Sequence, residues 1–336
     1  MDNTFLLVVL TVALALFFDF INGFHDTANA IATAVSTHAL RLRTAIIMAS
    51  LMNFAGAIAF TGVAKTITKG IVNPYHIPHG SVVIICALIS AIMWNLLTWY
   101  LGIPSSSSHT LIGSIAGASV AAAGIGALNM SGFINILKGL VFSPFLAFAV
   151  GYLMLSLFKV LLKNSNLHET NYRFRKLQIL TVCLQAFTHG TNDAQKSMGV
   201  ITLALLSAKY HTGSSIPFWV QVSCATAMAL GTSIGGWRII KTVGTKIMKI
   251  RPVSGVASDI SSALIIFGAT NLGLPVSTTH VISSAIMGVG TSYRPKAVKW
   301  ETATRMISTW IITIPISALV AALIFSVVRL MFFPMG

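Results

Sequence analysis

The sequence predicts an all-α polytopic membrane protein built from two inverted-topology repeats with broken helices. Two observations lead to this prediction. Of the 336 residues, 55% are hydrophobic and only 9% are charged, whereas soluble domains usually carry about a quarter charged residues. Apolar runs long enough to cross a bilayer also recur along the chain, and we count about ten inserted segments.

The first long segment covers residues 5–40 and is interrupted by polar residues. Uninterrupted apolar runs then cover residues 44–64, 81–101, 140–162, 218–236 and 306–333. The formal net charge of +15 would suggest nucleic-acid binding in a soluble protein. Here the basic residues lie mostly in loops between apolar runs, so we predict a lipid bilayer and no nucleic acid as the partner.

Two pairs of similar motifs indicate an internal duplication. "NGFHDTANA" at 22–30 resembles "HGTNDAQKS" at 189–197, and "LGIPSSSSHTLIGSIAG" at 101–117 resembles "LGLPVSTTHVISSAIMG" at 272–288. Both pairs occur in the same order at nearly the same spacing, as in a duplicated chain. The predicted parts are a first repeat, 1–162, a cytoplasmic connecting loop, 163–176, and a second repeat, 177–336.

The topology follows from counting segments. Five inserted segments separate the first motif from its copy, so the second repeat enters the membrane from the opposite side, as in secondary transporters. Most loop Lys and Arg residues lie on one side, near 41–43, 159–176, 238–251 and 294–305, which predicts a multi-pass cell-membrane protein with both termini outside. The count does not decide whether 81–123 and 253–290 cross fully or form re-entrant hairpins. An interfacial aromatic belt is expected from Trp99, Tyr100, Trp219, Trp237, Trp300 and Trp310.

The second motif pair predicts an oxyanion site. Pro104 and Pro275 each precede a run of hydroxyl residues and a histidine, a pattern typical of a half-helix that begins inside the membrane. Free N–H groups at such a start favour an anion such as phosphate. The alternative is simple helix capping and close packing by small residues. The predicted anion ligands are Ser106, Ser107, Ser108, Ser277, Thr278 and Thr279.

The first motif pair predicts a cation site. Asp26 and Asp193 are related by the repeat, and each follows a glycine that predicts a break in its helix. A charge inside a membrane is costly and needs a partner. We expect a coupling cation, H+ or Na+, at oxygens of Asp26, Asp193, Asn22, Asn29 and Asn192. The alternative is pairing within the chain, as between Asp193 and Lys196.

Other polar residues in these segments receive weaker roles. Asp19 has no counterpart, because Ala186 occupies its place in the second copy, and we predict a structural role for it. Candidates for proton transfer or helix orientation are His25, His109, His189, His280 and Lys196. No metal-ligand spacing and no catalytic residue is predicted. An intramembrane serine hydrolase remains a distant alternative, because it needs one nucleophile beside one base, whereas both constellations here are duplicated.

These motifs resemble the inorganic phosphate transporter family of the Pit or PHO4 type, whose signature is a duplicated G-x-N-D-x-x-N-like motif. The copies here read "GFHDTAN" at 23–29 and "GTNDAQK" at 190–196. The wider strings "DFINGFHDTANAIAT" and "FTHGTNDAQKSMG" are more similar to the bacterial branch than to the animal one. The resemblance implies a homodimeric, inverted-repeat symporter that imports inorganic phosphate. It also implies phosphate at the hydroxyl runs, coupling ions at Asp26 and Asp193, and no cofactor.

Three departures from the family pattern bear on the coupling ion. His25 and Lys196 each replace an asparagine of the signature, and Asn53 stands where sodium-coupled members carry a glutamate. They favour H+ over Na+, or co-transport of a divalent metal as a neutral metal–phosphate complex. Sodium-coupled phosphate symport and transport of sulfate or another oxyanion on the same fold remain the alternatives.

Overall fold

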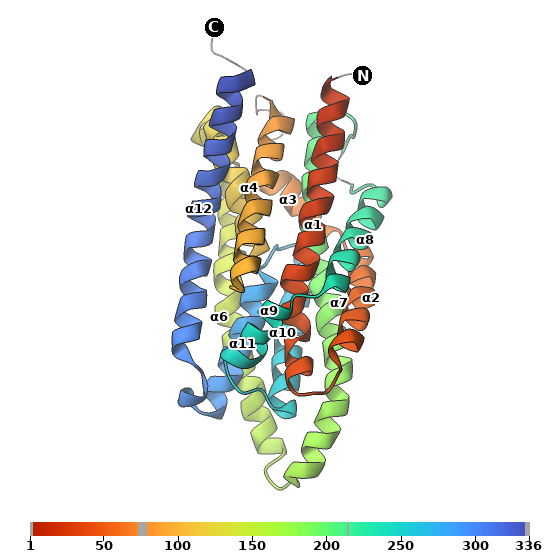
Figure 1. The fold of residues 1–336 in the computed structure, drawn as a ribbon, viewed down its shortest axis with the longest axis vertical. Coiled ribbons are helices and arrows are strands. Elements are labelled where there is room, and N and C mark those ends of the chain that lie inside the picture. Colours follow the sequence, from red (N-terminus) through yellow and green to blue (C-terminus); the bar gives the residue numbers. More distant parts are fainter. Residues whose placement is uncertain (1–2, 73–78, 214, 333–336) are drawn as a thin grey trace.

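The structure, a computed structural model, describes residues 3–72, 79–213 and 215–332, so the outer ends of both predicted repeats lie outside the described residues. It is a bundle of helices aligned with one long axis (Figure 1). The first-half helices are α1 (Asn3–Ser36), α2 (Leu42–Ala59), α3 (Gly62–Gly70), α4 (Gly80–Leu101), α5 (Ser107–Ala123) and α6 (Met130–Leu161). Those of the second half are α7 (Leu167–Ser207), α8 (Phe218–Ile234), α9 (Trp237–Lys241), α10 (Pro252–Asn271), α11 (Thr278–Tyr293) and α12 (Trp300–Phe332).

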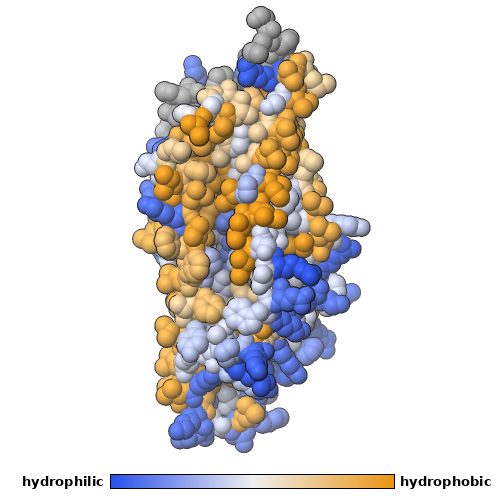
Figure 2. Space-filling model, turned by 90° about the vertical axis from the view of Figure 1, so that its left-hand side faces the viewer, coloured by the Kyte–Doolittle hydropathy of each residue, from blue (hydrophilic) through white to orange (hydrophobic). Residues whose placement is uncertain are grey.

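The surface and helix lengths fit a membrane protein. Six of the described helices are long and apolar enough to cross a bilayer, namely α1, α2, α4, α6, α10 and α12. Figure 2 shows hydrophobic residues over much of one face and hydrophilic residues gathered toward the lower end. The prediction of an all-α polytopic membrane protein is confirmed.

The helices of the two halves pair crosswise. Helix α1 packs against α8 while α7 packs against α2, and α5 packs against α12 while α11 packs against α6. In Figure 1, α1 begins at the upper end, where α12 finishes, and α7 begins at the lower end. Corresponding helices of the two halves therefore run in opposite directions, which is consistent with the predicted inverted repeat.

The predicted breaks at the two aspartate motifs are wrong. Both α1 and α7 are continuous helices through Asp26 and Asp193. The glycines that suggested a break instead allow close helix packing. A Cβ on Gly23 would collide with backbone atoms of Met228 and Thr232 on α8, and one on Gly190 would collide with the backbone of Asn53 on α2.

The second motif pair does interrupt its helices. Helices α4 and α5 form one hairpin and α10 and α11 another, and each pair is joined by a short non-helical segment. In Figure 1, α4 lies in the upper half while α10 and α11 lie in the lower half. The two tips meet, because the Ser108 hydroxyl of one donates to the Val276 carbonyl of the other at 2.9 Å. The structure therefore favours re-entrant hairpins over full crossings.

The connection between the halves is shorter than predicted. Helix α7 already begins at Leu167, so most of the expected loop 163–176 is helical. The Asn166 side chain caps this helix by accepting hydrogen bonds from the backbone N–H groups of His168 and Glu169. Glu169 then pairs with Arg173 one turn later, at 2.6 Å.

Candidate functional site

The site is built from the tips of the two hairpins. Ser106 caps α5 and Ser277 caps α11, and each hydroxyl accepts a hydrogen bond from the backbone N–H of the histidine three residues later. The other N–H groups of these first turns have no acceptor within their own helix. The two helix starts lie close together, because Ser108 bonds to the carbonyl of Val276. All six predicted anion ligands are buried there. The structure thus brings together the two helix N-termini and the hydroxyl groups that the sequence predicts for the site.

Asp26 lies against both tips. Its Oδ2 accepts a hydrogen bond from Ser107 at 2.6 Å, and its Oδ1 accepts one from Thr279 at 3.0 Å. The Nδ1 atom of His25 lies 2.7 Å from Oδ1. Because Ser107 belongs to α5 and Thr279 to α11, this one carboxylate links the two hairpins.

Asp193 occupies the matching place in the second half. Its Oδ2 accepts a hydrogen bond from Thr278 at 2.8 Å. Its Oδ1 lies 2.5 Å from the ammonium of Lys196, and Nε2 of His189 lies 3.1 Å from Oδ2. Lys196 is 1% exposed. The pairing with Lys196, which the sequence left as an alternative, is therefore present.

The three predicted asparagines differ in their surroundings. Asn29 donates to Thr279 at 2.9 Å and so joins the Asp26 cluster. Asn192 lies under the second tip, where it donates to the Leu274 carbonyl and accepts from the Val276 N–H, both at 3.2 Å. Asn22 is fully buried but neither its oxygen nor its nitrogen has a hydrogen-bond partner.

The histidines fall into two groups. His25 and His189 contact the aspartates, whereas His109 and His280 contact each other, with ring centroids 4.4 Å apart. His109 also lies 2.8 Å from its own cap, Ser106, through Nδ1. This second pair sits directly behind the tips and fits the predicted orienting role better than direct contact with a carboxylate.

Sequence reasoning missed three residues that support the site. Trp310 was expected in the aromatic belt, but it is 7% exposed, stacks on His280 at 4.0 Å and donates to the Pro104 carbonyl at 3.2 Å. Asn53 lies 3.1 Å from Nδ1 of His189. Thr98 lies 3.2 Å from Nε2 of His25 and 2.9 Å from Ser105. Only Asn53 gave a sequence signal, as a departure from the family pattern.

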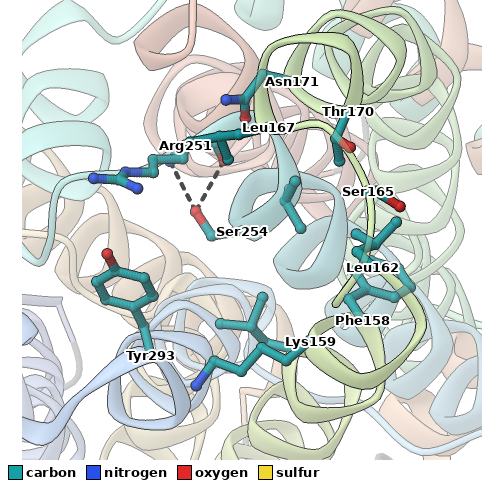
Figure 3. Close-up of a pocket in the computed structure, with 12 residues that line it drawn as sticks. Phe158, Lys159, Leu162, Ser165, Leu167, Thr170, Asn171, Arg251, Ser254 and Tyr293 are labelled. Atoms are coloured by element: carbon teal, nitrogen blue, oxygen red, sulfur yellow. Dashed lines mark hydrogen bonds between the residues drawn. The ribbon is translucent and has the colours of Figure 1, made fainter.

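A surface cavity lies apart from this site. It has a volume of about 270 Å³ and is lined by residues near the ends of α6 and α11 and the starts of α7 and α10, including Lys159, Arg251 and Tyr293 (Figure 3). None of the predicted site residues lines it. Within the part of the chain that the structure describes, no group of three or more His, Cys, Asp or Glu side chains could hold a metal ion.

In this site an oxyanion and the two carboxylates would compete for the same hydrogen-bond donors. Hydroxyls and helix N-termini suit an oxyanion, because they donate hydrogen bonds and carry partial positive charge. In this structure the same hydroxyls donate to the two aspartates. An anion at the tips would therefore replace the carboxylates as the acceptor.

Comparison with known proteins shows consistent similarities. A profile of the "Phosphate transporter family" (PHO4) matches residues 22–170 and 163–321. The chain is 62% identical to a "Probable low-affinity inorganic phosphate transporter" of Bacillus subtilis, over 99% of this chain and 100% of that protein. It is 44% identical to a Rhizobium meliloti protein of the same name, over 96% and 97%. A solved structure titled "The sodium-dependent phosphate transporter" matches with a TM-score of 0.88 at 25% identity, over 97% and 100% of the two chains.

Proposed function

The chain belongs to the phosphate transporter family, and we propose that it imports inorganic phosphate by symport with a cation, H+ in preference to Na+. Its relatives are named as transporters, so it is not an enzyme and the hydrolase alternative is dropped. The observation that carries the proposal is the meeting of two hydroxyl-bearing helix N-termini at two buried carboxylates.

Phosphate would bind between the hairpin tips. Its oxygens would accept hydrogen bonds from Ser107, Thr278 and Thr279, with the free N–H groups of α5 and α11 as further donors. Ser106 and Ser277 are committed to capping, and Ser108 bonds the opposite tip. We therefore assign them to shaping the site, together with His109 and His280.

Competition for the hydroxyls supplies a physical reason for coupling. Phosphate and Asp26 both require the hydrogens of Ser107 and Thr279. A cation that neutralises Asp26 weakens these charge-assisted hydrogen bonds and releases the hydroxyls to the anion. Each ligand then favours binding of the other, because such linkage is reciprocal. Transport would follow as the two hairpins and their helices alternate access to the site.

The surroundings of Asp26 favour a proton as the coupling ion. Both of its oxygens are engaged, by His25, Ser107 and Thr279, so a sodium ion would have to displace several partners. A proton needs no such set of oxygens. The sodium dependence of the structurally similar transporter supports the alternative, with Asn29 and Asn192 as added ligands. Symport of a neutral metal–phosphate complex is a further alternative.

The test is uptake of labelled phosphate by proteoliposomes that contain the purified protein. A proton gradient and a sodium gradient are imposed separately, and unlabelled phosphate and sulfate are added as competitors. We expect the proton gradient alone to drive accumulation and phosphate alone to compete. Stimulation by sodium only would reverse the assignment of the ion, and equal competition by sulfate would contradict phosphate selectivity.

We propose that the protein lies in the cell membrane with the lower end of Figure 1, where α7 begins, in the cytoplasm and with both chain ends outside. The excess of Lys and Arg in the loops expected at that end supports this orientation. The homodimer rests on the family resemblance. Cysteine labelling from outside intact cells, at a residue introduced near the start of α1, tests the orientation. The mass of the detergent-solubilised protein tests the dimer.

A further inference from the structure

A group of buried polar side chains lies on α1 next to the site, and neither the repeat nor the hairpins account for it. Asp19, Asn22 and Asp26 follow one another at helical spacing on one face of α1. Asp19 and Asn22 are both fully buried. None of the polar atoms of their side chains forms a hydrogen bond of good geometry, although Asn22 and Ser197 lie close enough to act on the carboxylate of Asp19. An unpaired carboxylate at such a position is costly.

Other helices bring further unsatisfied groups to the same region. Ser197 of α7 is fully buried, and its hydroxyl lies close to Asp19 without forming a hydrogen bond of good geometry. On α4, Asn95 is fully buried and its amide is unpaired. Asn95 lies one turn before Thr98 on α4, and Asn22 lies one turn before His25 on α1. Because Thr98 contacts His25, Asn95 lies on the side of α4 that faces α1.

The charged surroundings of Asp19 leave its charge uncompensated. The groups that act on it electrostatically are Asp193 and Lys196 on α7, and Cys224 on α8. The ammonium of Lys196 is already 2.5 Å from Asp193. Helix α4 contains no Asp, Glu, Lys, Arg or His. A cation from solution is therefore the remaining way to balance the charge of Asp19.

We propose that Asp19 binds a second transported proton, with Asn22 and Ser197 beside it and Asn95 on the neighbouring helix α4. The proton would join a carboxylate oxygen and make it a hydroxyl donor to a neighbouring amide or hydroxyl oxygen, so that no other bond breaks. This proposal rests on the proposed symport. It adds to the cation at Asp26 a site that has no counterpart in the second half, where Ala186 takes the equivalent place.

The test compares wild-type protein with Asp19→Asn and Asp19→Glu in proteoliposomes. Asparagine has the same shape but cannot exchange a proton, whereas glutamate can. Two readouts separate coupling from substrate binding. Phosphate exchange at equal concentrations needs no gradient, and net accumulation under a fixed pH difference does. The control is Asp259→Asn, which removes a buried carboxylate that is held by Thr33 and Thr181 at 2.7 and 2.9 Å.

We expect Asp19→Asn to exchange phosphate normally while its accumulation falls about tenfold for each unit of imposed pH difference, because one pH unit is a tenfold ratio of proton activity. Asp19→Glu and Asp259→Asn should accumulate phosphate as the wild type does. The midpoint of thermal unfolding of Asp19→Asn should not fall, since an unpaired buried charge is removed. Undiminished accumulation by Asp19→Asn would overturn the proposal, and so would a joint loss of exchange and fold. Failure of the wild type to accumulate phosphate would instead refute the proposed symport.

Discussion

The two aspartate clusters each accept a hydrogen bond from a hairpin hydroxyl but differ in charge balance. Asp26 and Asp193 each accept a short hydrogen bond from a hairpin hydroxyl, at 2.6 Å from Ser107 and 2.8 Å from Thr278. Asp193 also has the buried ammonium of Lys196 at 2.5 Å, whereas the nearest basic group to Asp26 is the imidazole of His25 at 2.7 Å. The backbone repeats, but the cation is built into only one copy.

This difference suggests how an inverted repeat can carry asymmetric coupling. In the second half the carboxylate is neutralised within the chain, so its hydrogen bond to Thr278 need not depend on an ion from solution. In the first half the partners of Asp26 among the described residues are His25 and two hydroxyl groups, so under the proposed function the coupling cation supplies the balancing charge. Under the proposed function, coupling therefore belongs to the first half, and the second half provides a permanent scaffold.

The largest expected effect comes from breaking the built-in pair. Lys196→Met leaves Asp193 as an unpaired buried charge, which costs about 3–5 kcal/mol of folding stability. The double variant Asp193→Asn with Lys196→Met removes both charges and should be much less destabilised than the sum of the single variants. Unfolding in mild detergent, followed by tryptophan fluorescence, measures all three. Additive losses would show that the two charges do not stabilise each other.

Removing the charge of the first cluster should strongly reduce transport and leave the fold intact. Asp26→Asn keeps the size of the side chain but cannot respond to a cation, so we expect net phosphate uptake to fall about 100-fold, equivalent to nearly 3 kcal/mol. The protein should still be monodisperse and retain its unfolding midpoint to within a few degrees. Asp259→Asn is the matched control, because Asp259 is similarly buried but bonds to Thr33 and Thr181 and to no hydroxyl of the tips. Near-normal uptake by Asp26→Asn would exclude its coupling role.

The sequence predicted the parts of the site better than their local backbone. The hydroxyl runs and aspartates were found because a repeat marks positions that one motif alone would not. The continuity of α1 and α7 was not predicted. The local sequence around a glycine is the same whether the glycine breaks its helix or allows another helix to pack closely against it. Only the contacts of Gly23 with α8 and of Gly190 with α2 separate these outcomes.

Side-chain contacts between helices could not be predicted from the sequence, whereas the pair within α7 could. Lys196 follows Asp193 by three residues, so an intrahelical pair was a foreseeable alternative. Trp310 and Asn53 reach the site from α12 and α2, and no local pattern indicates a contact between residues so far apart in the chain. Asp19 was expected to be structural because it lacks a repeat partner, yet its carboxylate has no hydrogen-bond partner.

The shared backbone of the two halves predicts equal sensitivity at the paired glycines. Gly23→Ala and Gly190→Ala each place a methyl group against backbone that cannot rotate away, and should each destabilise the protein by about 1–3 kcal/mol. Gly268→Ala is the control, because nothing lies within 4 Å of its added Cβ in α10. That change should be neutral or slightly stabilising. Thermal unfolding of the purified variants decides the comparison, and tolerance of alanine at position 23 alone would show that α1–α8 packing is looser than α7–α2 packing.

The hydroxyls offer the mildest way to separate the two clusters. Ser107→Ala and Thr278→Val each remove one hydrogen-bond donor that we assign to phosphate. A hydrogen bond to a charged group contributes about 1.5–3 kcal/mol, so KM for phosphate should rise about tenfold or more. Thr110→Val is the control, since its hydroxyl donates to the Ser106 carbonyl at 2.8 Å at the start of α5.

If the carboxylates compete with phosphate as proposed, Ser107→Ala and Thr278→Val should differ in the pH dependence of KM. Ser107→Ala removes a partner of the ion-sensitive Asp26, so the pH dependence of its KM should change. Thr278→Val acts on the permanently neutralised Asp193, so its KM should rise by the same factor at every pH. Uptake kinetics at three pH values measure this, and identical pH profiles for the two variants would place the coupling elsewhere than at Asp26.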